Sequence, residues 1–322
     1  MVNWAGIPAK ILEWKPLRLL ILISRKIVLP GFDGVPLYDV MVFFINGLSR
    51  GFITTRAAST SFNFFLALFP MLVFFFTIIP YIPIQDFQSS LMELITDLLP
   101  RSADASVEEI VRDVVTQPHA GWFSVSFVLT LYFSTNGIYS LMEAFNSTYH
   151  TIETRSWIKL RVVSLMLILI LSALLILSIG LISFGTTLLN LALPERILNS
   201  DFYFVLLITG KWIVILALLF FAISFLYYLA PAKRSHFRFI SAGSTFATLL
   251  VILTTFGFNF YVDNFSRYNV LYGSIGTLVV FLLWIYFNAI SLLAGFELNA
   301  SIYNAKRNKK GINDPPVSAP AA

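Results

Sequence analysis

Six long runs of apolar residues constrain this chain more than any other feature of its sequence. The clearest run, Tyr268–Phe296, contains no charged side chain and is long enough to cross a hydrocarbon core of ~30 Å as a tilted helix. Backbone polar groups in lipid must be satisfied within the spanning segment, which favours helices. We therefore predict an all-α polytopic membrane bundle over residues 57–302, with six transmembrane helices at 57–82, 121–142, 162–193, 204–232, 239–262 and 270–300.

The composition agrees with a chain that mostly faces lipid. Hydrophobic residues make up 57% of it and charged residues only 12%. The chain has no cysteine, so disulfides, a thiol nucleophile and a cysteine-based metal site are excluded. The first residues lack the order of basic, apolar and small residues of a signal peptide, and we expect no cleavage there.

The net charge of +5 reports topology rather than nucleic-acid binding. If the N-terminus is cytoplasmic, seventeen lysines and arginines fall in inside segments and four in outside segments, with Lys211 left at a helix end. This asymmetry follows the positive-inside rule and places both termini in the cytoplasm. Lys211 is an interfacial anchor if the fourth span starts at Trp212, and an intramembrane cation if it starts earlier.

Three segments are expected to lie outside the lipid. Residues 1–56 form a cytoplasmic and interfacial segment, with an amphipathic stretch at 11–29 (or else a poorly ordered tail) and an elbow helix near 40–48. Residues 83–120 are acidic and predict a short extracytoplasmic helical pair, either a lid or a simple cover over the bundle. Residues 303–322 predict a disordered cytoplasmic tail.

Small and polar residues recur inside the predicted spans, where they permit close helix contact or offer hydrogen bonds. Pro70 lies in the first span and predicts a kink, because an interior proline removes one backbone hydrogen bond. This kink either lines a wet cavity or is packed without a ligand. The residues expected to line a cavity or to pack helices are Asn63, Pro70, Asn136, Gly137, Gly243, Tyr272, Gly273, Gly276, Trp284, Asn288, Gly295 and Asn299.

Three charges are expected near the cytoplasmic membrane face. Arg56 precedes the first span, Glu143 follows the second, and Glu297 follows the charge-free part of the sixth. Charges at such depth usually face a bundle interior and find partners, so we predict a polar network of Arg56 with Glu143 and Glu297 that closes the inner side. The alternative is that each charge reaches water at the interface independently.

Several local sequences together resemble the YihY/BrkB family of bacterial inner-membrane proteins. They are Arg56–Ala58, Leu68–Pro70, Tyr228–Pro231, Tyr272–Gly276, Trp284–Tyr286 and Gly295–Ala300. The resemblance covers roughly Leu37 to Ala305. It implies six spans and a location in the bacterial inner membrane. The family has no settled activity, and its old label is ribonuclease BN.

No catalytic apparatus is visible in the sequence. The three histidines, His119, His150 and His236, have no metal-ligand spacing with carboxylates, and no nucleophile elbow or Walker A sequence occurs. A ribonuclease needs an acid/base pair or a metal-activated water, so we reject that label and expect no enzyme, metal or cofactor. We expect a transporter or flippase acting on a small solute or lipid, with membrane lipids as partners and no nucleic acid. The alternative is a membrane scaffold that binds an envelope partner.

Overall fold

The computed structural model describes residues 21–78, 120–148, 153–192, 201–232, 239–265 and 268–309, and the long elements in this part of the chain are all helices. Their bounds are α3 Leu37–Arg50, α4 Ile53–Ile78, α7 Ala120–Thr148, α8 Trp157–Ala192, α10 Asp201–Leu229, α11 Ala242–Phe265 and α12 Tyr268–Lys309. The predicted all-α class is confirmed.

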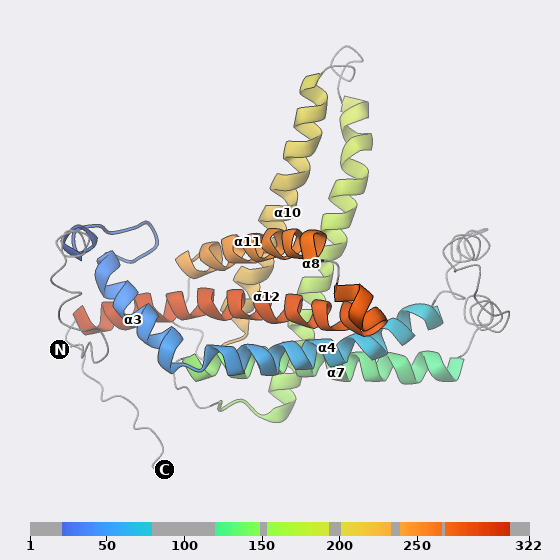
Figure 1. Cartoon of the computed structure of the whole chain (residues 1–322), viewed down its shortest axis with the longest axis horizontal. Helices are drawn as coiled ribbons and strands as arrows, with labels where there is room; N and C mark the ends of the chain where they lie inside the picture. Colours follow the sequence, from blue (N-terminus) through green and yellow to red (C-terminus); the bar gives the residue numbers. More distant parts are fainter. Residues whose placement is uncertain are drawn as a thin grey trace.

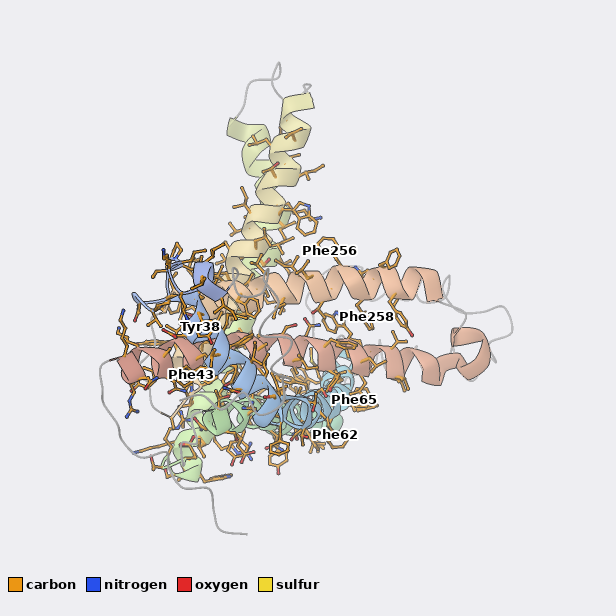
Figure 2. All side chains as sticks on the ribbon, turned by 60° about the vertical axis from the view of Figure 1, so that its left-hand side comes forward. Tyr38, Phe43, Phe62, Phe65, Phe256 and Phe258 are labelled. Carbon is orange, nitrogen blue, oxygen red and sulfur yellow. The ribbon has the colours of Figure 1, made fainter. Side chains whose placement is uncertain are left out.

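Four helices share one direction, and two others cross them. Figure 1 shows α4, α7, α11 and α12 running alongside one another, with α4 against α7 and α11 against α12 as the most extensive pairs. The helices α8 and α10 pack together and project from this layer, and the turned view in Figure 2 shows the same projection. Apolar side chains along the projecting pair, such as Ile176 and Val205, are exposed.

Five helices contain segments long and apolar enough to cross a membrane. These segments are Ile53–Phe74, Trp157–Ile182, Val205–Leu229, Ala242–Val262 and Leu278–Lys309 in the described part of the chain. The remaining predicted span, 121–142, lies within α7, which has 29 residues and would extend over about 40 Å at 1.5 Å per residue. Serine, threonine and asparagine interrupt the apolar residues of α7, and the helix turns several of these polar side chains toward α4 and α8.

The main core lies where the helices cross at the α3 end of the bundle. Phe145 of α7 stacks on Phe296 of α12 with ring centroids 4.2 Å apart, and Tyr227 of α10 meets both rings edge-on. All three side chains are almost fully buried. Large aromatic rings at one crossing bury much apolar area and fix the relative position of three helices.

The predicted elbow helix is present as α3, somewhat longer than expected. It begins after Pro36 and ends at Arg50, and the N–H of the next residue, Gly51, donates to the Gly47 carbonyl at 2.8 Å. Its buried face, with Val40 and Phe44, packs on Leu298 near the end of α12 and forms a second apolar cluster.

This second cluster corrects the predicted tail. The prediction that the chain is disordered from residue 303 is wrong for residues 303–309, because α12 continues to Lys309. Ile302 and Ala305 are buried against α3, and Lys306 Nζ donates to Asp33 Oδ2 at 2.7 Å. Packing of one face of α12 therefore stabilises helix where composition alone suggested none. Residues 310–322 lie outside the described residues.

Other helix limits also differ from those predicted. The helix α10 begins at Asp201, so Lys211 lies within it and is exposed, and α11 begins at Ala242 rather than at 239. The predicted extracytoplasmic pair at 83–120 lies outside the described residues, apart from the first residue of α7. Residues 11–20 of the predicted amphipathic stretch 11–29 also lie outside them.

Candidate functional site

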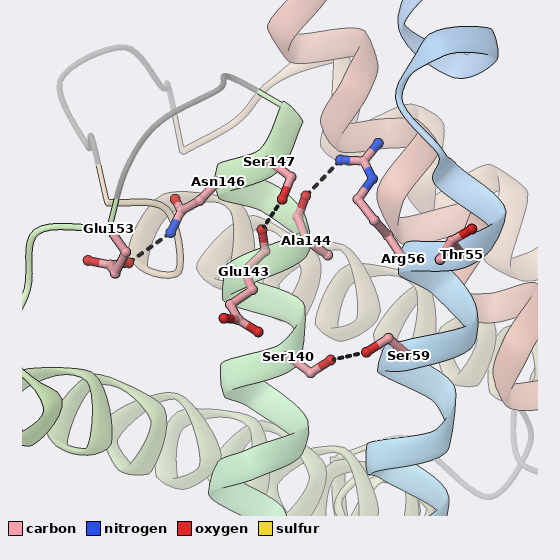
Figure 3. Close-up of a pocket in the computed structure, with 9 residues that line it drawn as sticks. All are labelled: Thr55, Arg56, Ser59, Ser140, Glu143, Ala144, Asn146, Ser147 and Glu153. Atoms are coloured by element: carbon pink, nitrogen blue, oxygen red, sulfur yellow. Dashed lines mark hydrogen bonds between the residues drawn. The ribbon is translucent and has the colours of Figure 1, made fainter. Parts of the chain in front are cut away.

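A polar cavity of about 450 Å³ lies between α4 and α7 at the α3 end of the bundle. Figure 3 shows its walls, with Arg56 and Ser59 on α4 facing Ser140 and Ala144 on α7. Hydroxyl groups dominate the lining, and they come from Thr55, Ser59, Ser140 and Ser147.

Arg56 is a largely buried cation, and its N–H donors are only partly satisfied. Its Nη1 donates to the Ala144 carbonyl at 2.8 Å and to Thr148 Oγ1 at 2.7 Å, and its Nη2 lies 3.7 Å from Glu297 Oε2. The Nε and Nη2 atoms are buried and make no hydrogen bond to any described residue. A guanidinium has five N–H donors, and a buried donor without an acceptor is costly. Arg56 therefore has capacity left for a polar guest.

Glu297 closes the far side of Arg56. Its side chain is 8% exposed, and a Cβ placed on Gly47 of α3 would overlap its carboxylate. Glycine at position 47 is what permits α3 to approach α12 at this point. The pair of Arg56 and Glu297 thus joins α3, α4 and α12.

Glu143 lines the same cavity but is not paired with Arg56. Its Oε1 accepts a hydrogen bond from Tyr139 one turn earlier at 2.9 Å, and the side chain is exposed. Among the three predicted charges, the structure thus brings Arg56 and Glu297 into contact and leaves Glu143 on the opposite, open wall.

Sequence reasoning missed a second network at the outer edge of this cavity. Arg155 makes a two-pronged salt bridge with Glu153, at 2.8 Å from Nε and 2.7 Å from Nη2. Arg155 Nη2 also donates to the Ala230 carbonyl at 2.8 Å. Asn146 donates to Glu153 at 2.7 Å and accepts from the Ala232 N–H at 2.9 Å. The available signal was an acid and a base two residues apart, Glu153 and Arg155, in the short linker between α7 and α8. The backbone groups that complete the network lie at the end of α10, which is distant in sequence.

The salt bridge makes part of the stability depend on pH. Hydrogen bonds from Arg155 lower the pKa of Glu153, so the folded state favours the carboxylate. The resulting contribution to the free energy of unfolding is fully present above the ordinary glutamate pKa of about 4.3. It is lost as the pH falls through the lowered pKa of Glu153. We expect the melting temperature of purified Glu153→Gln to fall less steeply with decreasing pH than that of the parent protein. Arg155→Gln should remove the same component, and an unchanged acid-side slope in both variants would contradict the assignment.

The predicted residues of α7 and α4 contact neighbouring helices or their own backbone. Asn136 Oδ1 accepts from Arg161 Nη1 of α8 at 2.6 Å, and a Cβ on Gly137 would lie 3.2 Å from the Phe64 ring. Asn63 donates to the Ser59 carbonyl of its own helix at 3.0 Å. Pro70 lies inside α4 and is half-buried. These four residues do not line the polar cavity.

Gly243 and Gly295 form the closest contact between α11 and α12. A Cβ on Gly295 would lie 2.5 Å from Ala247 Cβ and 2.6 Å from the Gly243 carbonyl oxygen, and a Cβ on Gly243 would overlap the Gly295 carbonyl. Asn299 secures the start of α11, since it accepts from the Gly243 N–H at 2.8 Å and donates to Ser241 Oγ at 2.9 Å. These residues pack helices rather than line the cavity.

The remaining predicted residues lie in the earlier part of α12. Asn288 donates to the Trp284 carbonyl at 2.8 Å, and the Trp284 ring lies 5.7 Å from that of Phe281. Tyr272, Gly273 and Gly276 belong to the first turns of α12, of which the structure describes the helical backbone.

No group of three or more metal-ligating side chains occurs in the part of the chain that the structure describes. All three histidines lie outside the described residues. The rejection of a ribonuclease therefore stays a prediction from the sequence.

The fold and the cavity define a multi-pass α-helical membrane protein with a polar pocket at one end. The family described as "Virulence factor BrkB" matches residues 44–319. The chain is 30% identical over 253 residues to "Putative ribonuclease-like protein YfkH" of Bacillus subtilis, covering 79% of this chain and 91% of that protein. The chain belongs to the BrkB (YihY) family, and the resemblance found in its motifs is confirmed.

Shorter matches link the chain to other membrane proteins. It is 37% identical over 99 residues to a UPF0761 membrane protein of Alteromonas mediterranea, covering 31% of this chain and 33% of that protein. It is 40% identical over 77 residues to a UPF0761 membrane protein of Pseudoalteromonas translucida, covering 24% of this chain and 26% of that protein. No solved structure matches the chain.

Proposed function

We propose that this protein is a transporter or flippase that moves a small solute or a lipid across the membrane without an ATPase of its own. The observation that supports the proposal is the polar cavity between α4 and α7. Its volume of about 450 Å³ falls within the range of about 300–1,000 Å³ of small-molecule sites. An anchor or a spacer has no need of such a cavity within a bundle of membrane helices.

The walls of the cavity suit a polar guest with charges of either sign. Arg56 has unused N–H donors for an anionic group, and Glu143 on the open wall offers a carboxylate to a cation. The serine and threonine hydroxyls between them both donate and accept. Charged side chains within membrane helices commonly mark substrate pathways.

The contact between α4 and α7 offers a route from the cavity toward the other end of the bundle. Ser59 and Ser140 lie 3.5 Å apart beside the cavity, and Thr77 and Ser126 lie 3.2 Å apart near the opposite ends of the two helices. Hydroxyl pairs exchange partners at lower cost than interlocked apolar side chains, so this seam can open at one end while it stays closed at the other.

The absence of cysteine permits a direct test of such alternation. Ser59→Cys with Ser140→Cys, oxidised to a disulfide, holds α4 and α7 together at the cavity end, and Ser126→Cys reports on the other end. In a transporter, we expect the oxidised closure to raise several-fold the rate at which a membrane-impermeant maleimide labels the reporter. The labelling is measured in vesicles of both orientations.

The matched control is Ser126→Cys alone under the same oxidising conditions, which should label at its resting rate. A labelling rate that is the same with the cavity end bridged and unbridged would contradict alternating access. That result would favour the scaffold, in which the cavity is a static feature of a protein that binds an envelope partner.

A further inference from the structure

A second groove, of about 300 Å³, is lined by residues of α7 and α8. Its floor is apolar and consists of Leu131 from α7 with Ile158, Val162 and Leu165 from α8. It shares no lining residue with the polar cavity. The single charged side chain in its wall is Arg161, near the start of α8.

Arg161 is held in a defined position. Its Nη1 donates to Thr135 Oγ1 at 2.9 Å and to Asn136 Oδ1 at 2.6 Å. Its guanidinium carbon lies 5.3 Å from the centre of the Tyr132 ring and 5.5 Å from that of the Trp157 ring. Two hydrogen bonds and two cation–π contacts restrict the side chain to one orientation.

The same contacts leave one edge of the guanidinium available. Arg161 Nε and Nη2 donate to no protein oxygen among the described residues, and no described carboxylate forms a salt bridge with Arg161. The planar fork of an arginine matches two oxygens of a phosphate. Arg161 is therefore a preoriented hydrogen-bond donor for phosphate, and no described residue occupies its binding edge.

The surroundings of Arg161 identify the kind of phosphate compound. Tyrosine and tryptophan are typical of the headgroup level of a membrane, where one end of a side chain is apolar and the other wet. Most of the groove surface beside them is apolar, which suits an acyl chain. Basic pockets between membrane helices are known to hold acidic lipid headgroups.

We propose that the α7–α8 groove binds an anionic phospholipid, with its phosphate on Arg161 and one acyl chain along Val162 and Leu165. The proposal does not depend on transport, because a lipid in this groove lies outside the polar cavity. A free phosphate ion would use only Arg161 and leave the apolar floor empty.

Trp157 in the groove wall provides the readout. The full chain is placed in phosphatidylcholine vesicles that contain phosphatidylglycerol as the minor lipid, with bromine on the acyl chains of one lipid or the other. Bromine quenches a neighbouring indole, and the Trp157 signal is the emission of the parent minus that of Trp157→Phe. At equal mole fractions of brominated lipid, we expect brominated phosphatidylglycerol to be enriched at Trp157 about fivefold over brominated phosphatidylcholine. This factor corresponds to the attraction of an anionic lipid by one cation near a membrane surface.

Two variants test the groove itself. Arg161→Gln should abolish the preference for phosphatidylglycerol. Leu165→Phe should weaken the preference, because the larger side chain fills the groove while every charge is kept. If Arg161→Gln fails to fold, Leu165→Phe alone tests the proposal. The matched control is Lys159→Gln, which removes an exposed charge from the same part of α8 and should retain the preference.

Equal quenching by the two lipids in the parent protein would overturn the proposal. A preference that Lys159→Gln removes as fully as Arg161→Gln would also overturn it, since the attraction would then come from surface charge and not from the groove.

Discussion

Arg56→Met alone should lower the melting temperature of the purified protein strongly, and Arg56→Met combined with Glu297→Met should restore most of the loss. The single variant leaves Glu297 as a buried charge without its cation, which costs about 3 kcal/mol or more. At roughly 2–4 °C per kcal/mol for a chain of this size class, the expected fall is about 10 °C. The double variant replaces both buried charges with apolar groups of similar length, which is often close to neutral.

The exposed pair of Lys306 and Asp33 is the matched control. It also joins the N-terminal segment to α12, but the Lys306 side chain is 38% exposed against 11% for Arg56. Because water screens such a pair, Lys306→Met should cost about 1 kcal/mol or less. If the double variant of Arg56 and Glu297 is as unstable as Arg56→Met, the pair does not act as a buried couple. A stable double variant without alternating labelling would separate the functional role of the pair from its structural one.

Gly243→Leu should prevent accumulation of folded protein or lower its melting temperature more than any other single change considered. Its new Cβ would overlap the Gly295 carbonyl and the Asn299 side chain, so α11 and α12 must separate along their length. Inserting side-chain atoms into a packed contact usually costs about 1–3 kcal/mol. We expect a larger loss in the free energy of unfolding here, because backbone atoms obstruct the new side chain. The hydrogen bonds of Asn299 at the start of α11 are also lost.

Gly257→Leu gives a control in the same helix. A Cβ at Gly257 meets no atom within 4 Å, so the same substitution adds an apolar side chain without a clash. We expect thermal unfolding in detergent close to that of the parent. Equal destabilisation by Gly243→Leu and Gly257→Leu would mean that intrinsic helix properties dominate, and not the close approach of α11 to α12.

The spans were predictable because their signal is local. Runs such as Tyr268–Phe296 encode length and apolarity without reference to any other segment, and small residues such as Gly243 and Gly295 indicate close helix contact. The direction in which α8 and α10 cross the other helices was not predictable, since an apolar run does not encode its angle to a neighbour. Similarly, the continuation of α12 to Lys309 depends on a partner face in α3 that lies far away in sequence.

The candidate site was predictable only in part, for the same reason. Arg56 and Glu297 were recognisable as charges at the ends of apolar runs, and the structure brings them together. Glu143 has the same sequence signal, but the helical phase of α7 places it beside Tyr139 on the open wall. The bond of Asn146 to Ala232 joins segments that are 86 residues apart, and no short pattern in the sequence indicates such a partner.

The continuity of α12 has a mechanical consequence. It is one helix of 42 residues, and no proline occurs between Tyr268 and Lys309 to act as a hinge. Glu297 and Lys306 lie about 14 Å apart along this rod. A rigid rotation or slide of α12 that separates Glu297 from Arg56 therefore also displaces Lys306 from Asp33, so the cavity wall and the N-terminal segment are released by the same movement.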